Sequence, residues 1–300
     1  MLIDLRHHII TLTAVFLALA VGILVGSSFI TGSSIERKVS GQLEVEFDKI
    51  RQENKVKQQA IDALEDNIEK NAQFDRAAAP LLVDGQLKWH RVAIIQTGDY
   101  SEATQSAKSI IEAAGAKVTS VTILSNLDSP SAWERARRAV GLSMGDENQK
   151  DTVSILLESL ANAIVIGNNS AALDKFQKEG LLSKSGEYTR FVPMVVLVGG
   201  DRQEKSDRPT HIDLVLIDKL KEAGVMTLVG VEPVEAVTSY IPEYHRKAIS
   251  TVDNVDQPMG QVAMVFALTG ESGNFGVKKS ADRVAPAYLE SGQWRIKSQR

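Results

Sequence analysis

The feature that most constrains this chain is an apolar run near its N-terminus. Residues 9–30 read IITLTAVFLALAVGILVGSSFI and contain no ionisable side chain. As an α-helix these 22 residues extend about 33 Å, enough to cross a hydrocarbon core of about 30 Å. We therefore predict a transmembrane helix over residues 9–30.

Two other interpretations of this run stay open. A cleaved signal peptide has a shorter apolar region, of about 7–15 residues, although small Gly-Ser-Ser triplets at 26–28 and 32–34 resemble cleavage sites. A buried core helix is the other alternative. We expect a retained single-pass anchor in the cell membrane, with residues 1–8 as a cytoplasmic tail and the C-terminal domain extracytoplasmic. Arg6 favours this orientation, whereas Arg37 and Lys38 weaken the charge asymmetry.

Small residues recur at every fourth position of the run, at Ala14, Ala18, Gly22 and Gly26. Such a stripe lets two helix backbones approach closely in lipid, where packing holds them together. It predicts self-association of the helix. The alternative is that Ala and Gly are simply common in membrane helices.

A polar, heptad-patterned segment follows at residues 35–79. Steps of four and three residues connect its seam positions, which are Leu43, Phe47, Ile50, Asn54, Lys57, Ile61, Leu64, Ile68 and Asn71. This period is typical of a left-handed coiled coil, in which a polar residue such as Asn54 can fix register and strand number. We predict a parallel coiled coil that ends before Pro80, because the residue before a proline avoids the α conformation. A single amphipathic helix lying on its own domain is the alternative.

Composition excludes several classes of protein. The net charge of −4 argues against a nucleic-acid partner, since such proteins carry a basic excess. The absence of cysteine excludes disulfide scaffolds, thiolate metal sites and cysteine nucleophiles. A mean hydropathy of −0.09 argues against several membrane spans.

Residues 90–292 alternate short apolar runs with amphipathic segments, which indicates an α/β outer domain. The predicted fold class is a Rossmann-like, doubly wound, mostly parallel sheet covered by helices on both faces. The predicted strands are 92–96, 118–124, 164–166, 193–198 and 225–231, and the predicted helices are 100–114, 132–140, 151–161, 212–223 and 259–268.

The carboxyl ends of these strands are where such sheets usually bind ligands. Asp99 and Asp201 each follow a glycine there and could form a carboxylate pair, or could be ordinary turn residues. The sequence contains no GxGxxG after the first strand, no Walker motif, no HExxH and no GxSxG. We therefore predict no enzymatic activity and no evident cofactor, with an enzyme that uses a nucleotide or sugar as a minor alternative.

Metal ligands are sparse. Of the five histidines only His7 and His8 are adjacent, and an oligomer could bring several of their imidazoles together. Interfacial anchoring beside Arg6 is the alternative for this pair. The six methionines form no MxxM or MxM cluster, so Met259 and Met264 are predicted to pack in an apolar helix.

Residues 250–268 read STVDNVDQPMGQVAMVFAL. Asp256 or Gln257 followed by Pro258 is typical of a helix N-terminus. We predict a folding and docking element, not a copper site, because carboxylate oxygens suit Mg²⁺ or Ca²⁺ whereas Cu(I) prefers sulfur.

Both ends of the chain resemble the MctB-type copper transporter family known from mycobacteria. The N-terminal DLRHH followed by TLTAVFLALAVGILVGSSF is similar to that family's N-terminal signature, and GNFGVK at 273–278 resembles its closing segment. The family's central signature is matched by Ser250, Thr251, Val252, Asp253, Asn254, Val255, Asp256, Pro258 and Gly260. The sequence departs from the family pattern at Gln257 and Phe275, where Thr and Tyr are expected.

The resemblance implies a single-pass envelope protein with a role in copper transport or efflux and copper homeostasis. Copper is implied by the family alone. Expected partners are membrane lipid, further copies of the same chain through the two N-terminal helices, and another envelope protein. The alternative function is a coiled-coil envelope scaffold or regulator of cell-wall or division enzymes, for which the coiled coil offers a docking groove.

Overall fold

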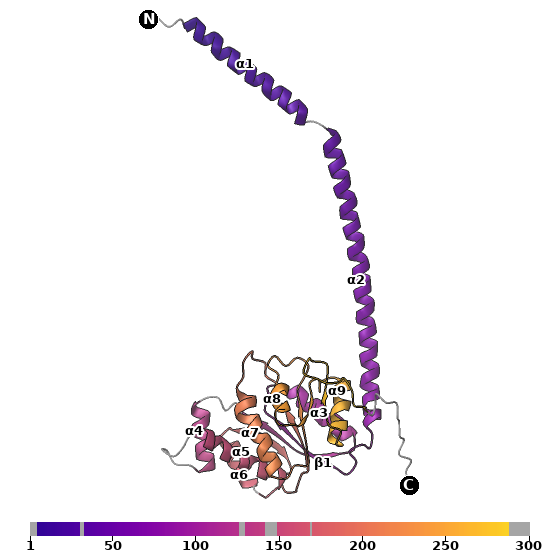
Figure 1. Cartoon of the computed structure of the whole chain (residues 1–300), viewed down its shortest axis with the longest axis vertical. Helices are drawn as coiled ribbons and strands as arrows, with labels where there is room; N and C mark the ends of the chain where they lie inside the picture. Colours follow the sequence, from indigo (N-terminus) through magenta and orange to yellow (C-terminus); the bar gives the residue numbers. More distant parts are fainter. Residues whose placement is uncertain (1–4, 31–32, 126–129, 142–148, 169, 288–300) are drawn as a thin grey trace. The chain divides into compact units, whose positions relative to one another are not determined.

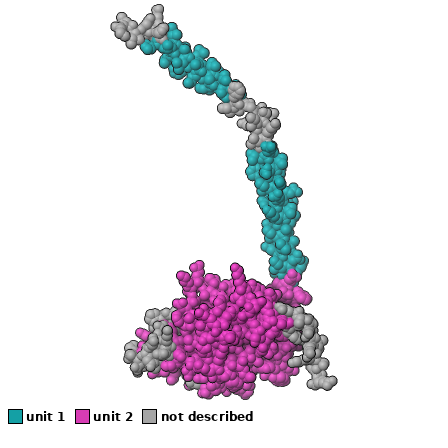
Figure 2. Space-filling view, viewed as in Figure 1, with its two compact units in different colours: residues 1–70 teal, residues 71–300 magenta. Residues whose placement is uncertain are grey.

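The computed structural model describes residues 5–30, 33–125, 130–141, 149–168 and 170–287, and it divides into two compact units, residues 1–70 and 71–300 (Figure 2). Unit 1 is wholly helical in its described residues. Unit 2 contains the sheet and its covering helices (Figure 1).

Helix α1 (Leu5–Ile30) coincides with the predicted membrane segment. Within the described residues, His8–Ser28 is the one stretch of helix that is long and apolar enough to cross a membrane. Its hydroxyls bond to carbonyls one turn back, with Thr13 donating to Ile9 (2.7 Å) and Ser28 to Leu24 (3.0 Å). Such internal pairing leaves these groups satisfied where no water is present.

Helix α2 (Ser33–Val83) corrects one prediction. It does not end before Pro80 but continues through it to Val83. A proline inside a helix loses one hydrogen bond, and burial of neighbouring apolar groups offsets that loss here, because Ala79, Val83 and Leu87 all lie in the core of unit 2.

The apolar seam of α2 is exposed in the single chain. Its exposed members include Leu43, Phe47, Ile50, Ile61, Leu64 and Ile68. The heptad spacing thus places an unpaired apolar stripe along one helix, and the coiled coil stays a prediction.

The sheet of unit 2 has seven strands in the order β3-β2-β1-β4-β5-β6-β7. Their bounds are β1 (Arg91–Gln96), β2 (Lys117–Leu124), β3 (Leu182–Gly186), β4 (Met194–Val198), β5 (Thr227–Val231), β6 (Ser250–Val252) and β7 (Asn274–Phe275). All neighbours pair in parallel except β3, which runs antiparallel to β2. The prediction of an α/β fold with a mostly parallel sheet is confirmed.

Two details of the predicted sheet are wrong or missing. The apolar run at 164–166 is not a strand, because α5 (Gln149–Val165) extends through most of it and buries Leu157, Leu160 and Ile164 on one face. The prediction missed β3, β6 and β7. The residues of β3, LSKSG, are mostly polar because this strand lies at the edge of the sheet.

Helices cover both faces of the sheet (Figure 1). One apolar layer includes α4 (Pro130–Val140), α5, α6 (Ser170–Lys178), the π-helix η1 (Pro209–Asp213), α7 (Leu214–Glu222) and α8 (Ile241–His245). The other includes the end of α2, α3 (Ser101–Ala113) and α9 (Pro258–Leu268). Strand β1 contributes Ala93 and Ile95 to the first layer and Val92 and Ile94 to the second, as the two-residue period of a strand requires. Both layers consist of residues from Ala79 onward, so residues 71–287 contain the whole described core.

We predict that Phe266→Ala strongly destabilises unit 2. Phe266 lies in α9, which packs on α3, β5 and β6, and its side chain is buried. Removing the ring leaves a cavity that costs about 3–5 kcal/mol. Urea unfolding of residues 71–287 measures this loss. Phe74→Ala, at an exposed position, is the matched control and should change the unfolding free energy by less than about 0.5 kcal/mol.

Candidate functional site

The strand order reverses between β1 and β4, and the loops that follow these two strands meet there. In doubly wound sheets a ligand usually enters this crevice. Here the loops abut: Asp99 N donates to Gly200 O (3.0 Å), and a Cβ on Gly98 would lie 2.2 Å from Gly200 O. The buried Gln96 amide also donates to Gly98 O (3.0 Å). Direct backbone contact between the two loops therefore occupies part of the crevice.

Arg208 joins the two loops. It lies one residue before η1, and its buried side chain points back to the strand ends. Its Nη1 donates to Thr97 O (3.0 Å) and to Asp99 Oδ1 (3.1 Å), and it lies 3.5 Å from Asp201 Oδ1. The structure thus brings together the two carboxylates that the sequence had suggested as a pair, and it adds a cation between them.

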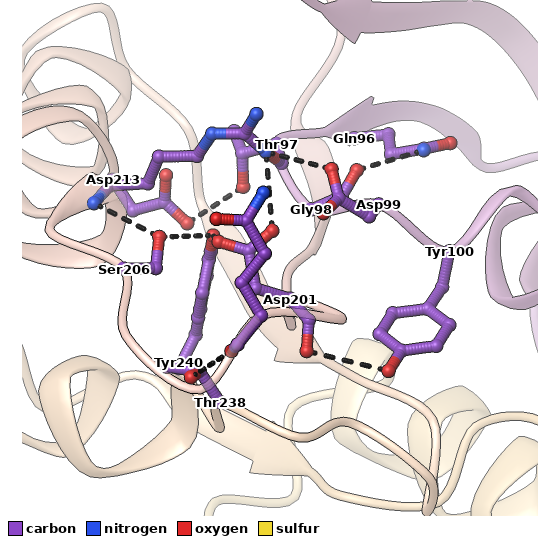
Figure 3. Close-up of polar contacts among 12 residues, drawn as sticks. Gln96, Thr97, Gly98, Asp99, Tyr100, Asp201, Ser206, Asp213, Thr238 and Tyr240 are labelled. Carbon is purple, nitrogen blue, oxygen red and sulfur yellow. Dashed lines mark hydrogen bonds and ion pairs between the residues drawn. The ribbon is translucent and has the colours of Figure 1, made fainter. Parts of the chain in front are cut away.

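The pKa values of the two carboxyl groups shift in opposite directions. A hydrogen bond with Asp201, followed by burial, raises the pKa of Asp99 above its usual value. Burial alone raises the pKa of Asp201, but hydrogen bonds from Asp99, Ser206 and Tyr240 and the charge of Arg208 outweigh it and lower that pKa overall. Tyr240 OH donates to Asp201 Oδ2 at 2.7 Å (Figure 3). Asp201 is therefore the ionised partner of Arg208.

Asp213 is a third carboxyl group beside the pair, at the end of η1. Its Oδ2 accepts hydrogen bonds from Thr97 Oγ1 (2.7 Å) and Tyr244 OH, whereas Oδ1 is buried with no hydrogen-bond partner among the described residues. Complete burial raises the pKa of Asp213 to about 7, against the lowering effects of those hydrogen bonds and of Arg208. This carboxyl group is therefore partly protonated at neutral pH.

A second polar cluster follows β5 and β6. The buried Glu232 accepts from Lys278 Nζ (2.7 Å) and from Tyr240 N (2.8 Å). The buried Asp253 accepts from the backbone N–H groups of Val277 (2.8 Å) and Lys278 (3.0 Å). Asp253 thus joins the signature segment to the loop after β7, and Glu232 joins that loop to the one after β5.

The rest of the signature also makes contacts within the fold. Asp256 does not cap α9; its Oδ1 accepts from Val234 N (2.8 Å), and Gln257 is the N-cap residue, without a side-chain cap bond. A Cβ on Gly260 would lie 2.1 Å from Asn254 O, so this position admits no side chain. The remaining signature residues are Ser250, Thr251 and Val252 in β6, the buried Val255, and Pro258 as the first residue of α9.

The other predicted residues lie elsewhere. His8 is exposed in α1, and the side chain of His7 lies outside the described set. Ala14, Ala18, Gly22 and Gly26 are exposed along α1, and Asn54 is exposed in α2. Met264 is buried in α9 and Met259 is exposed. No group of three or more His, Cys, Asp or Glu side chains that could hold a metal occurs among the described residues.

Sequence reasoning did not identify Arg208, Asp213 or Tyr244. Arg208 ends a polar loop in which several cations and anions alternate, so nothing marks it as buried. Asp213 gives the one signal in the sequence for this buried cluster, because it is a charged residue among the apolar positions of a helical pattern.

The chain is thus an α/β-domain protein in which an apolar N-terminal helix and a long polar helix precede the domain. Within that class, the chain belongs to the family described as "Copper transport outer membrane protein, MctB", whose sequence profile matches residues 2–286. The resemblance seen at the two ends of the sequence is therefore confirmed.

Curated relatives align with this chain over nearly their whole length. "Copper transporter MctB" from Mycobacterium bovis is 23% identical over 314 aligned positions, which cover 93% of this chain and 98% of the relative. The proteins of that name from two Mycobacterium tuberculosis strains match to the same extent.

We predict that Asp213 makes unit 2 less stable as the pH rises. Its folded-state pKa of about 7 lies above the value of 3.8 for an aspartate in water, so the unfolded chain releases this proton first. The contribution of Asp213 to stability therefore falls between about pH 4 and pH 7 and is constant above that. Replacing Asp213 with Asn removes this dependence. The difference in unfolding free energy between the wild type and the variant should therefore change by up to about 4 kcal/mol between about pH 4 and pH 7.

Urea unfolding of residues 71–287 at several pH values measures this slope. Asp207→Asn, at an exposed carboxylate next to Arg208, is the control and should keep the wild-type slope. Equal slopes in wild type and Asp213→Asn contradict the prediction.

Proposed function

We propose that this chain is a single-pass membrane protein that acts in copper transport or efflux, and so in copper homeostasis. In this proposal α1 anchors the chain in the cell membrane, and the α/β domain lies outside the cytoplasm. The observation that carries it is the family match over residues 2–286, which includes α1. The name of the relatives, copper transporter, supports copper as the transported substrate.

A homo-oligomer is part of the proposal. One helix encloses no pore, so passage of an ion requires several copies of α1 or a partner protein. Two features support several copies. No atom lies within 4 Å of a Cβ built on Gly22 or Gly26, so this face of α1 is open to another helix, and the apolar seam of α2 is exposed.

His7 and His8 are the ligands that such an oligomer could offer to copper. Both belong to the first turns of α1, and parallel copies would bring several imidazoles to one end of the bundle. Met259 and Met264 are poorer candidates, because five positions on a helix separate side chains by about 140° and Met264 is buried. The proposal includes no enzymatic step and no resident cofactor.

Deletion of the gene should raise cellular copper after a copper challenge, measured by mass spectrometry of washed cells. Re-expression of the wild-type chain should restore the lower level, and the double variant His7→Ala/His8→Ala should restore it only in part. The exposed His211→Ala is the matched control and should complement fully. Membrane fractionation and N-terminal sequencing confirm that each variant is retained. Copper that does not change on deletion contradicts the proposal.

An envelope scaffold or regulator of cell-wall or division enzymes is the second candidate. The exposed seam of α2 favours it, because a long apolar stripe on a helix can accept the apolar face of a partner helix. Microscopy of the same deletion strain separates the two functions. Altered cell shape or separation with normal copper supports the scaffold.

We predict that Asn54→Ile stabilises the α2 oligomer but makes its strand number less uniform. A polar seam residue costs stability while it specifies register, so the apolar replacement should raise the melting temperature of the segment 36–76. Circular dichroism and sedimentation equilibrium measure both effects. The control Gln58→Ile changes an exposed position outside the seam. A wild-type segment that stays monomeric at high micromolar concentration would contradict the coiled coil.

A further inference from the structure

The turn before β1 holds a tryptophan in an unusual backbone conformation. Trp89 has φ of +70° and is the third residue of a turn closed by His90 N and Leu87 O (3.0 Å). With φ above zero, that position favours glycine, and a bulky side chain there is an outlier. The Trp89 ring is nevertheless 88% exposed. The backbone is therefore strained at Trp89, although the Trp89 side chain contributes little buried surface to the fold.

Two further apolar side chains are exposed on the same edge of the sheet. Phe191 precedes β4 and is 42% exposed, and Met226 precedes β5 and is 80% exposed. Strands β1, β4 and β5 are consecutive neighbours, so the three preceding loops lie within about 10 Å of one another. Arg91 Nε donates to Phe191 O (3.0 Å), and Met226 N donates to Pro193 O (2.8 Å). We call Trp89, Phe191 and Met226 the amino-edge patch.

Cations flank this patch. Lys88 and Arg91 bracket Trp89 and His90, Lys88 Nζ lies 5.5 Å from the Trp89 ring centroid, and Arg190 precedes Phe191. The nearby Glu187 is already paired with Lys117 at 3.0 Å. In a chain with a net charge of −4, this edge therefore concentrates positive charge beside exposed apolar groups. Its charge complements an anionic surface.

We propose that the amino-edge patch binds the surface of an anionic phospholipid bilayer. Tryptophan is favoured at the boundary between headgroups and acyl chains, and neighbouring Lys and Arg side chains add attraction to anionic headgroups. The chain also carries a helix that is long and apolar enough to cross a bilayer, so a lipid surface is a partner in keeping with the rest of the sequence. The strained turn directs the Trp89 ring outward, which is the orientation that insertion requires. The proposal does not depend on copper.

Vesicle binding by residues 71–287 tests the proposal, because this part contains the whole described core. A Trp133→Phe background leaves Trp89 as the one tryptophan, since Trp294 lies beyond residue 287. The probes are phosphatidylcholine vesicles with and without phosphatidylglycerol. Co-sedimentation measures binding, and quenching of Trp89 fluorescence by brominated acyl chains measures insertion.

The expected result is binding and quenching with the anionic vesicles and neither with the neutral ones. Trp89→Gly should bind at least ~10-fold more weakly, as expected for loss of a tryptophan anchor. Its melting temperature should equal or exceed that of the parent, because glycine relaxes the turn. Lys88→Gln should weaken binding at low salt, and Phe74→Ala, an exposed aromatic outside the patch, should leave it unchanged.

Three results overturn the proposal. One is the absence of binding to anionic vesicles, and another is binding that Trp89→Gly does not weaken. The third is self-association of residues 71–287 that Trp89→Gly abolishes without any vesicle binding, which would assign the patch to a second copy.

Discussion

The carboxyl end of the sheet depends on Arg208, which among the described residues is the one cation that contacts both Asp99 and Asp201. A buried guanidinium is tolerable only when its charge is paired and its N–H groups are bonded, and the two carboxyl groups and Thr97 O supply those partners. Asp213 adds a third acid to the same neighbourhood, so acids outnumber the cation. The pKa of Asp99 is raised by its hydrogen bond with Asp201 and by burial, that of Asp201 is lowered, and burial raises the pKa of Asp213 to about 7.

The contacts of Arg208 limit the space that is open to a ligand at the carboxyl ends of the strands. Arg208 and the contact of Gly98 with Gly200 occupy part of the crevice at which doubly wound sheets usually bind a ligand. Surfaces outside the crevice remain exposed: the small-residue face of α1, the apolar seam of α2, and the edge around Trp89. All three suit association with lipid or with other helices.

The sequence predicted those strands and helices whose burial produces a recognisable pattern of apolar residues. Val92, Ile94 and Ile95 form a continuous apolar run because β1 is covered on both faces, and Asp99 and Asp201 were identified because both follow strand-end glycines. Ile164 was misassigned because a short apolar run fits either a buried strand or the last turn of a buried helix. Arg208 could not be predicted, since its burial depends on contacts with residues more than a hundred positions earlier.

The hydrogen bonds of the buried carboxylates also bear on copper binding. The oxygens of Asp201, Glu232 and Asp253 already accept hydrogen bonds or ion pairs from Tyr240, Lys278 and the Val277 amide, among others. Binding a metal at these carboxylates would leave their present donors buried and unpaired, at a cost of about 1–3 kcal/mol each. Oxygen is also the ligand type that Cu(I) favours least. Chemistry and packing therefore both argue against copper coordination by these three carboxylates.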